Sequence, residues 1–125
     1  MAGLTHDTPW PTEITLKKAS RALHIVFSDG RDFLFPLEYL RVFSPSAEVR
    51  GHGPGQETLQ TGKRQVSVDE ITPVGQYAIQ PHFSDGHNTG IYSWDYLLDL
   101  GVNQEEYWAQ YLNRMDAAGA SRDTH

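Results

Sequence analysis

The chain has 125 residues, a length that suits one domain and allows about two-thirds of the unfolded surface to be buried on folding. It contains no cysteine, which excludes disulfides, a thiol nucleophile and thiolate-ligated zinc or iron–sulfur sites. The net charge of −6 argues against nucleic acids and anionic membranes as partners, because these attract basic proteins. The sequence has neither an apolar run long enough to cross a membrane nor a secretory signal, so we expect a cytoplasmic protein.

The acidic charge is concentrated in the second half of the chain. Residues 1–64 carry eight Lys or Arg and seven Asp or Glu, whereas residues 65–113 carry seven acidic side chains and no Lys or Arg. A surface of this kind attracts cationic partners and repels anionic ones. The candidate interaction residues are therefore acidic, and a plain solvated face is the alternative interpretation. They are Asp95, Asp99, Glu105 and Glu106.

The first half is predicted to contain strands, a short helix and a loop. The chain begins with a flexible arm over residues 1–9. Alternation of apolar and polar residues then indicates three strands, over 13–18, 22–27 and 32–36. An Asp-Gly turn joins the last two strands, because Asp accepts local backbone hydrogen bonds and Gly tolerates positive φ. Apolar residues at helical spacing predict a helix over 37–43, and the glycine-rich stretch 51–62 predicts a mobile loop.

The second half repeats the pattern of strands around an Asp-Gly turn. Short strands are predicted over residues 65–68, 71–74, 77–83 and 90–93. A turn at Asp69-Glu70 separates the first two strands, and Pro81 predicts an edge or a bulge for the third. The phrase Phe-Ser-Asp-Gly occurs twice, at 27–30 and 83–86, which common turn chemistry explains more readily than duplication.

Two helices are predicted to close the domain. Ser93 is expected to cap a helix over 94–100 that Gly101 ends, and Asn103 to cap a second helix. The buried stripe of the second helix contains Tyr107, Trp108, Tyr111, Leu112 and Met115. The fold class is thus one α+β domain over residues 10–116, with antiparallel hairpins, a short helix after the first hairpin and two C-terminal helices. A disordered tail is predicted over 117–125.

Histidine, with six copies, is the strongest candidate for chemistry. His82 and His87 bracket the second Asp-Gly turn, where Asp85 lies between them, and His52 is on the glycine-rich loop. Imidazole nitrogens and a carboxylate suit zinc or another divalent metal. The spacing matches no recognised ligand pattern, so structural or solvated histidines are the favoured interpretation and a metal site is the alternative.

Other patterns point to surface contacts rather than catalysis. Arg41 and Arg50 form a basic patch that could dock a carboxylate or phosphate, although pairing with Glu38 and Glu48 is the favoured interpretation. A hydrolytic triad is unsupported, because the serines lie in predicted turns without a neighbouring base. The loop 51–55 lacks the Gly-Lys-Ser/Thr ending of a phosphate-binding loop. No catalytic residue is assigned.

Several motifs in a fixed order resemble one known family. They are Trp10-Pro11, the stretches 23–30 and 40–47, Asp85-Gly-His87, and the segment 92–97 with sequence Tyr-Ser-Trp-Asp-Tyr-Leu. Together they resemble the N-terminal domain of gamma-butyrobetaine hydroxylase and trimethyllysine hydroxylase, which also occurs alone in bacteria. The resemblance runs from Trp10 to Leu112, and the stretch 44–55 is similar to the stand-alone bacterial form.

The resemblance implies a fold without the activity. In the hydroxylases this domain binds a structural zinc through three cysteines and one histidine, positions that fall here on Ser44, Ser46, Val49 and His87. Serine hydroxyls are poor zinc ligands and valine is none, so no cofactor is expected. The domain that holds iron and 2-oxoglutarate has no counterpart in this sequence, so hydroxylase activity is not implied.

We therefore expect a non-catalytic accessory module that docks an unidentified protein partner and binds neither nucleic acid nor membrane. Arg41 and Arg50 join the acidic residues as candidate interaction residues. Because related domains are attached to P-loop ATPases that carry iron–sulfur clusters, the resemblance links the module to iron–sulfur protein handling. The alternative is a small metal- or ligand-binding protein that uses the histidine cluster formed by His82, Asp85, His87 and His52.

Overall fold

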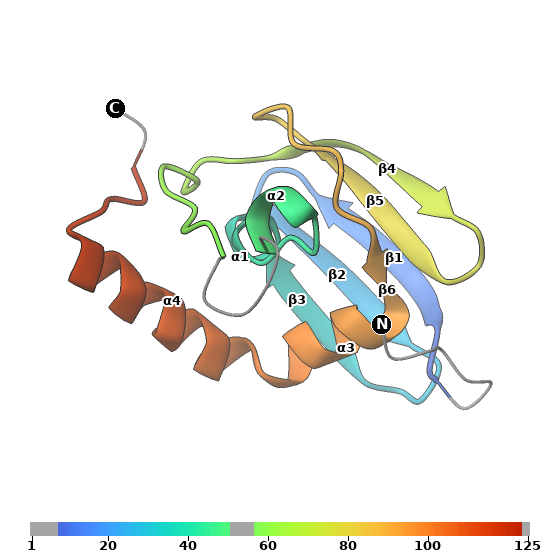
Figure 1. Cartoon of the computed structure of the whole chain (residues 1–125). Helices are drawn as coiled ribbons and strands as arrows, with labels where there is room; N and C mark the ends of the chain where they lie inside the picture. Colours follow the sequence, from blue (N-terminus) through green and yellow to red (C-terminus); the bar gives the residue numbers. More distant parts are fainter. Residues whose placement is uncertain (1–7, 51–56, 124–125) are drawn as a thin grey trace.

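Two antiparallel sheets of three strands each form the framework of the chain (Figure 1). The computed structural model describes residues 8–50 and 57–123. The first sheet has the order β1-β2-β3, with strands Pro11–Lys17, Ala22–Phe27 and Asp32–Pro36. The second has the order β4-β5-β6, with strands Val68–Val74, Ala78–Phe83 and Tyr92–Ser93. The predicted hairpin over 22–36 is confirmed with the same strand boundaries.

Helices connect the sheets and close the domain, which confirms the α+β class. They are α1 (Leu37–Val42), α2 (Ala47–Arg50), α3 (Trp94–Val102) and α4 (Gln104–Ala118). Figure 1 shows α3 beside the strands, while α4 extends away from the sheets at one end of the molecule. Ser93 caps α3 as predicted, because its Oγ accepts a hydrogen bond from the Tyr96 N–H. No helix in the described part of the chain is long and apolar enough to cross a membrane.

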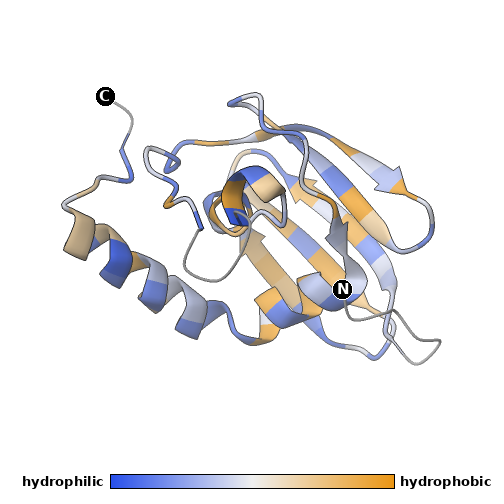
Figure 2. Cartoon of the chain, viewed as in Figure 1, coloured by the Kyte–Doolittle hydropathy of each residue, from blue (hydrophilic) through white to orange (hydrophobic). Residues whose placement is uncertain are grey.

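The core lies between the two sheets and the helices. Leu23, Ile25 and Phe27 alternate on the inner face of β2 and are almost fully buried. They share one cluster with Ile79 of β5 and Leu97 of α3, so both sheets and α3 pack on a common centre. In Figure 2 the hydrophobic colour is concentrated on the strands and α3, whereas α4 is mostly polar. Only Tyr111 and Met115 of the predicted α4 stripe are fully buried.

The repeated Phe-Ser-Asp-Gly phrase forms the same turn in both sheets. Gly30 and Gly86 have φ values of 90° and 89°, and each donates its N–H to the carbonyl of the preceding Phe. Each Asp accepts a hydrogen bond from the backbone N–H two residues later. The first strand of each sheet, β1 or β4, also has a register shift near its start. Four residues of common turn chemistry thus dictate a local geometry that the two sheets share.

The course of β4 differs from the sequence prediction. A turn was expected at Asp69-Glu70, but β4 passes through both residues without interruption. The register shift between Val68 and Glu70 absorbs the extra residue as a bulge-like irregularity. Pro81 lies in β5, the middle strand, but β6 pairs only with Ala78 and Ile79. The sheet is therefore only two strands wide at Pro81, where proline is tolerated.

Gly101 does not end α3, contrary to the prediction. The helix continues to Val102, and Asn103 is the residue at its C-terminal end. A Cβ at Gly101 would lie 2.6 Å from the ring of Phe33, so the glycine is needed for a close approach between α3 and β3. Asn103 precedes α4 as predicted, but its side chain bonds to Asp99 and does not cap α4.

Residues 117–123 also differ from the disordered tail predicted over 117–125, of which the last two residues lie outside the described part of the chain. Helix α4 runs to Ala118 and ends at Gly119, which has a left-handed φ of 62°. The chain then returns to the segment before β4, where Gly62 donates its N–H to Ser121 and Arg64 donates to Arg122. Long-range pairing of this kind cannot be read from the polar composition on which the prediction rested.

Candidate functional site

A buried hydrogen bond joins the α1–α2 connection to the second Asp-Gly turn. The Oγ atom of Ser44 lies 2.8 Å from Nε2 of His87, and His87 Nδ1 lies 3.3 Å from Oε2 of Glu48. Because a carboxylate can only accept, the neutral imidazole carries its proton on Nδ1, and Nε2 accepts from the Ser44 hydroxyl. The Ser44 oxygen in turn accepts from the Ser46 N–H at 3.2 Å. Every polar atom of the imidazole is thereby paired.

Burial decides the protonation state of His87. Desolvation, reinforced by the positive charge of Arg41, lowers the pKa of the imidazole and outweighs the opposing effect of Glu48 and Asp85. His87 therefore remains neutral at physiological pH.

The expectation that no serine has a neighbouring base is wrong. Ser44 contacts His87 and His87 contacts Glu48, the same succession of hydroxyl, imidazole and carboxylate that a hydrolytic triad has. However, Ser44 is not accessible to a substrate, because it is only 1% exposed and Gly90 packs directly against its Oγ.

The zinc implied by the family resemblance does not fit this set of residues. Ser44 and His87 are in direct hydrogen-bond contact, closer than the roughly 3.3 Å that separates two ligands of a tetrahedral zinc. Ser46 Oγ bonds to Thr89, and Val49 is buried without a donor atom. No buried side-chain polar atom lacks a partner within the described residues, so none is left aimed at a metal.

The two histidines that flank the second Asp-Gly turn hydrogen-bond to different partners. His82 Nε2 bonds to Thr72 across β4 and β5, whereas His87 faces Ser44. His52 lies outside the described residues. Over residues 8–50 and 57–123, no group of three His, Asp or Glu is arranged to hold a metal ion. Asp85 Oδ1 accepts the backbone N–H of His87, and Asp85 Oδ2 is paired with cationic side chains rather than with an imidazole.

Asp85 forms a small ion-pair network on the second Asp-Gly turn. Its Oδ2 accepts from Arg41 at 2.9 Å and from Lys63 at 2.6 Å. Burial by itself would raise the pKa of Asp85, but the hydrogen bond from Lys63 and the charge of Arg41 outweigh it and lower the pKa to about 2. Sequence reasoning missed Lys63, which lies 22 residues away and carries no local signal.

The predicted partners of the two arginines are wrong. Arg41 pairs with Asp85 rather than Glu38, which instead forms a two-point ion pair with Arg122 at 2.7 Å. Arg50 does not pair with Glu48; its guanidinium packs over the ring of Tyr96 at 5.6 Å from the centroid. Helical spacing brings residues 38 and 41 to neighbouring turns, but a tertiary contact gives Arg41 a better-placed carboxylate. Residues 48 and 50 are two apart and do not face each other on a helix, so Arg50 is free to pack on Tyr96.

The four candidate acidic residues fall into two classes. Asp95 accepts from Ser93 and Asp99 accepts from Tyr107 and Asn103, so both are held within the fold. Glu105 and Glu106 are exposed in the first turn of α4, where their charge complements the helix dipole. No Lys or Arg in the described part of the chain pairs with either of them.

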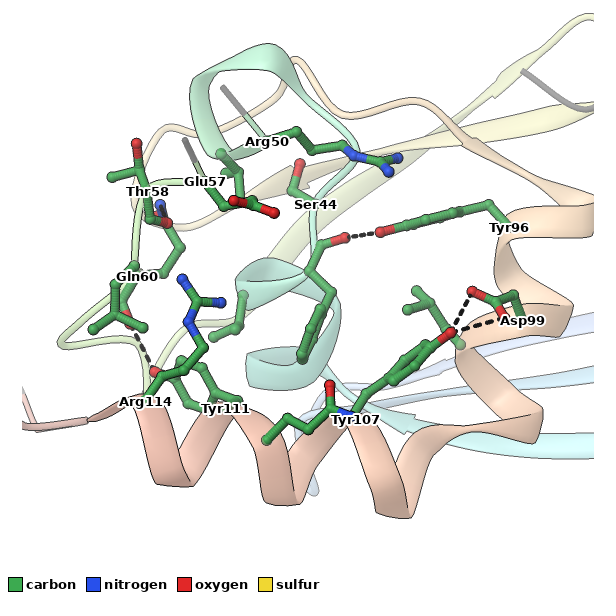
Figure 3. A pocket seen from close by; sticks show the side chains of 16 residues that line it. Ser44, Arg50, Glu57, Thr58, Gln60, Tyr96, Asp99, Tyr107, Tyr111 and Arg114 are labelled. Carbon is green, nitrogen blue, oxygen red and sulfur yellow. Dashed lines mark hydrogen bonds between the residues drawn. The ribbon is translucent and has the colours of Figure 1, made fainter. Parts of the chain in front are cut away.

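A pocket of about 310 Å³ opens between α2, α3 and α4, and we call it the arginine–tyrosine pocket (Figure 3). Tyr96, Tyr107 and Tyr111 supply aromatic walls, and Arg50 and Arg114 approach from α2 and α4. Tyr107, Tyr111 and Arg114 recur at helical spacing, a signal from which this face of α4 could have been predicted. Burial raises the pKa of Tyr96 and of Tyr111 to about 12, so both hydroxyls keep their protons.

A second pocket of about 560 Å³ lies where α3 meets α4, and we call it the elbow pocket. Tyr39, Val102 and Trp108 form its apolar wall, and Glu105 and the Glu38–Arg122 ion pair lie at its side. Val102 is 60% exposed, so its apolar side chain remains accessible at this pocket. The acidic residue Glu105 was identified from the sequence, but nothing in the sequence indicated that α3 and α4 leave a pocket between them.

Comparison with known proteins places the chain in a family. A family model described as gamma-butyrobetaine hydroxylase-like, N-terminal, matches residues 14–98. The chain belongs to this family. The match confirms the resemblance stated from the motifs, and its description names an N-terminal domain rather than a catalytic one. Among curated proteins the search found no match.

Solved structures similar to this member of the gamma-butyrobetaine hydroxylase-like N-terminal family agree with the fold. Two NMR solution structures are 43% and 51% identical, with TM-scores of 0.80 and 0.81. They cover 93% and 96% of this chain, and 91% of each of those chains is covered. A crystal structure from Acidithiobacillus ferrooxidans, described as a DUF971-family protein with unknown function, is 44% identical with a TM-score of 0.62. It covers 73% of this chain and 91% of its own.

Proposed function

We propose that this domain is a non-catalytic module that docks a cationic segment of another protein, with an apolar side chain of that segment seated in the elbow pocket. The observation that carries the proposal is the exposed Val102 at a pocket whose apolar wall also includes Tyr39 and Trp108. Interfaces are built on buried apolar anchors of this type, surrounded by polar rims. The pocket volume of about 560 Å³ is ample for one large side chain.

Charge complementarity determines the partner's chemistry. Glu105 lines the pocket and Glu106 follows it in the first turn of α4, and both are exposed and without a cationic partner among the described residues. The one arginine at the pocket, Arg122, is neutralised by Glu38 and stacks on Trp108 at 5.1 Å. With no Lys or Arg in residues 65–113, the surrounding surface favours a segment rich in Lys or Arg. The link to iron–sulfur proteins, which the resemblance suggests, stays a prediction.

The test uses synthetic peptides of defined composition and the full chain labelled with ¹⁵N. One peptide set carries Leu or Trp between lysines, a second replaces the apolar residue by Ala, and a third replaces the lysines by Glu. We expect only the first set to shift amide resonances around Val102, with affinity that falls as salt is added. Binding by the acidic set, or shifts elsewhere on the surface, would contradict the proposal.

Variants separate the two parts of the proposed surface. Val102→Asp should abolish binding without unfolding the chain, because the side chain is mostly exposed. Glu105→Gln/Glu106→Gln should weaken binding and reduce its salt dependence. The matched control is Asp69→Asn/Glu70→Gln, which removes the same charge from exposed positions on β4. An equal loss in this control would show that net charge alone, and not the elbow pocket, attracts the peptide.

A further inference from the structure

The arginine–tyrosine pocket has walls suited to a small organic molecule and lies apart from the elbow pocket. Its volume of about 310 Å³ is at the lower end of the range for small-molecule sites. Val49, Leu59 and Leu100 join the rings of Phe43 and the tyrosines as its apolar lining, and polar or charged side chains supply the other half of its wall. The polar groups that remain able to donate hydrogen bonds therefore decide which ligand it prefers.

The hydroxyls of the three tyrosines already donate hydrogen bonds to other groups of the protein. Tyr96 donates to the carbonyl of Phe43 at 2.5 Å, and Tyr111 donates to the carbonyl of Gln60 at 2.7 Å. Tyr107 donates to the carboxylate of Asp99 at 3.0 Å, as the dashed lines in Figure 3 show. Each hydroxyl has one proton, so these side chains offer a ligand aromatic surface but no donor.

Arginine is the one strong donor left in the pocket. Four arginines form ion pairs with carboxylates within the described residues, and Arg21 bonds to the amide of Gln65. The two that have neither kind of partner there, Arg50 and Arg114, both line this pocket. Figure 3 shows Arg50 and Arg114 on opposite sides of it. Two unpaired guanidinium groups around one cavity are suited to an oxyanion, which they can bind through paired N–H donors.

Two carboxylates limit the charge that the pocket tolerates. Glu57 lies between the two arginines in Figure 3 without an ion pair to either, and Asp99 lies on the α3 side. These groups offset the attraction of the arginines for any anion, and the cost of removing water rises more steeply with ligand charge than the attraction does, so a doubly charged ligand such as a phosphate monoester is disfavoured. A singly charged carboxylate can accept from both guanidinium groups, one oxygen to each, and leaves the rest of the pocket for an apolar body.

We propose that the arginine–tyrosine pocket binds a small organic monocarboxylate whose apolar or aromatic body rests against the tyrosine rings. The carboxylate is held between Arg50 and Arg114, and the aromatic body displaces water from the walls of the cavity. This site is independent of the docking surface at the elbow pocket, because it uses the opposite charge and a different face of α4.

The test follows amide resonances of the ¹⁵N-labelled full chain during titration with phenylacetate, 2-phenylethanol, phenethylamine and inorganic phosphate. We expect saturable shifts with phenylacetate, at affinities in the millimolar range or better, centred on the pocket. The neutral alcohol and the amine should bind at least about ten-fold more weakly, because they lack the anion. Shifts elsewhere, equal binding of the alcohol or the amine, or tighter binding of phosphate would overturn the proposal.

Variants that remove a positive charge and variants that remove a negative charge should change the affinity for phenylacetate in opposite directions. A merely structural role of these residues would not produce this pattern. Arg50→Gln and Arg114→Gln should each weaken phenylacetate binding about ten-fold, because each removes a charge-assisted hydrogen bond. Glu57→Gln should strengthen it by removing repulsion. Arg31→Gln, on the first Asp-Gly turn, is the matched control and should leave binding unchanged. Unchanged affinity in both pocket arginine variants, or weaker binding after Glu57→Gln, would refute the assignment.

Discussion

The substitution Ser44→Ala tests whether the serine hydroxyl holds the buried imidazole of His87 in place. In the native protein the hydroxyl lies 2.8 Å from His87 Nε2 and accepts from the Ser46 N–H at 3.2 Å. Alanine removes both contacts while changing little else, because it fits the same space. The His87 side chain is only 3% exposed, so water cannot readily replace the lost donor.

The expected cost follows from the groups that are left without partners. An unpaired buried polar group costs about 1–3 kcal/mol, and the imidazole Nε2 becomes such a group in the variant. The weaker contact to the Ser46 N–H adds to this loss, for a total of about 2–4 kcal/mol in the free energy of unfolding. In a domain of this size that corresponds to a fall in Tm of roughly 10 °C.

Urea denaturation at neutral pH, followed by far-ultraviolet circular dichroism, measures the effect. Ser20→Ala is the control, because Ser20 is exposed and its hydroxyl makes only a 3.4 Å contact to Lys17. The control should stay within about 0.5 kcal/mol of the native protein. The double variant Ser44→Ala/His87→Leu should recover part of the loss, since it removes both polar partners together. A Ser44→Ala variant as stable as the control would refute the reasoning.

Three further measurements test other contacts. Since Lys63 and Arg41 lower the pKa of Asp85 to about 2, its stabilisation is present above its usual pKa of 3.8 and is lost as the pH falls toward 2. In Asp85→Asn the midpoint of urea unfolding should therefore fall less than in the native protein as the pH decreases over that interval. Profiles of midpoint against pH that run parallel for the two proteins would contradict this. Gly101→Ala should destabilise the fold by about 1 kcal/mol, because the clash with Phe33 outweighs the gain in helix propensity; a more stable variant would oppose it. Elemental analysis of the purified protein should find zinc and iron well below one atom per chain, since hydroxyls are poor ligands, and a stoichiometric metal would count against that.

Local rules predicted the elements well wherever neighbouring residues supply the geometry. The hairpin over 22–36 depends on the alternation of apolar and polar residues and on a glycine with positive φ in its turn. The cap of α3 depends on the Ser93 side chain, which bonds to a backbone N–H three residues away. The order of motifs from Trp10 onward was sufficient to recognise the family. Errors arose where a distant group was decisive. Gly101 suggested a helix end, but the ring of Phe33 made it a contact position within α3.

The candidate site was only partly accessible from sequence for the same reason. The histidines and acidic residues were identified, but their partners come from remote segments: Ser44 and His87 are separated by 43 positions. The imidazoles of His82 and His87 hydrogen-bond to the hydroxyls of Thr72 and Ser44, partners that the sequence did not indicate. The pockets are lined by segments that lie far apart in the chain, which no local pattern brings together.

The two Phe-Ser-Asp-Gly phrases separate what the sequence determined from what the tertiary structure decided. Sequence alone determined the turn, since the same four residues produce the same glycine conformation and the same backbone hydrogen bonds in both sheets. The surroundings decided the role of each aspartate. Asp29 pairs with its neighbour Arg31 in the turn, whereas Asp85 reaches Arg41 and Lys63 from distant segments. Turn geometry follows from local sterics, but an ion pair needs two groups that only the folded chain brings together.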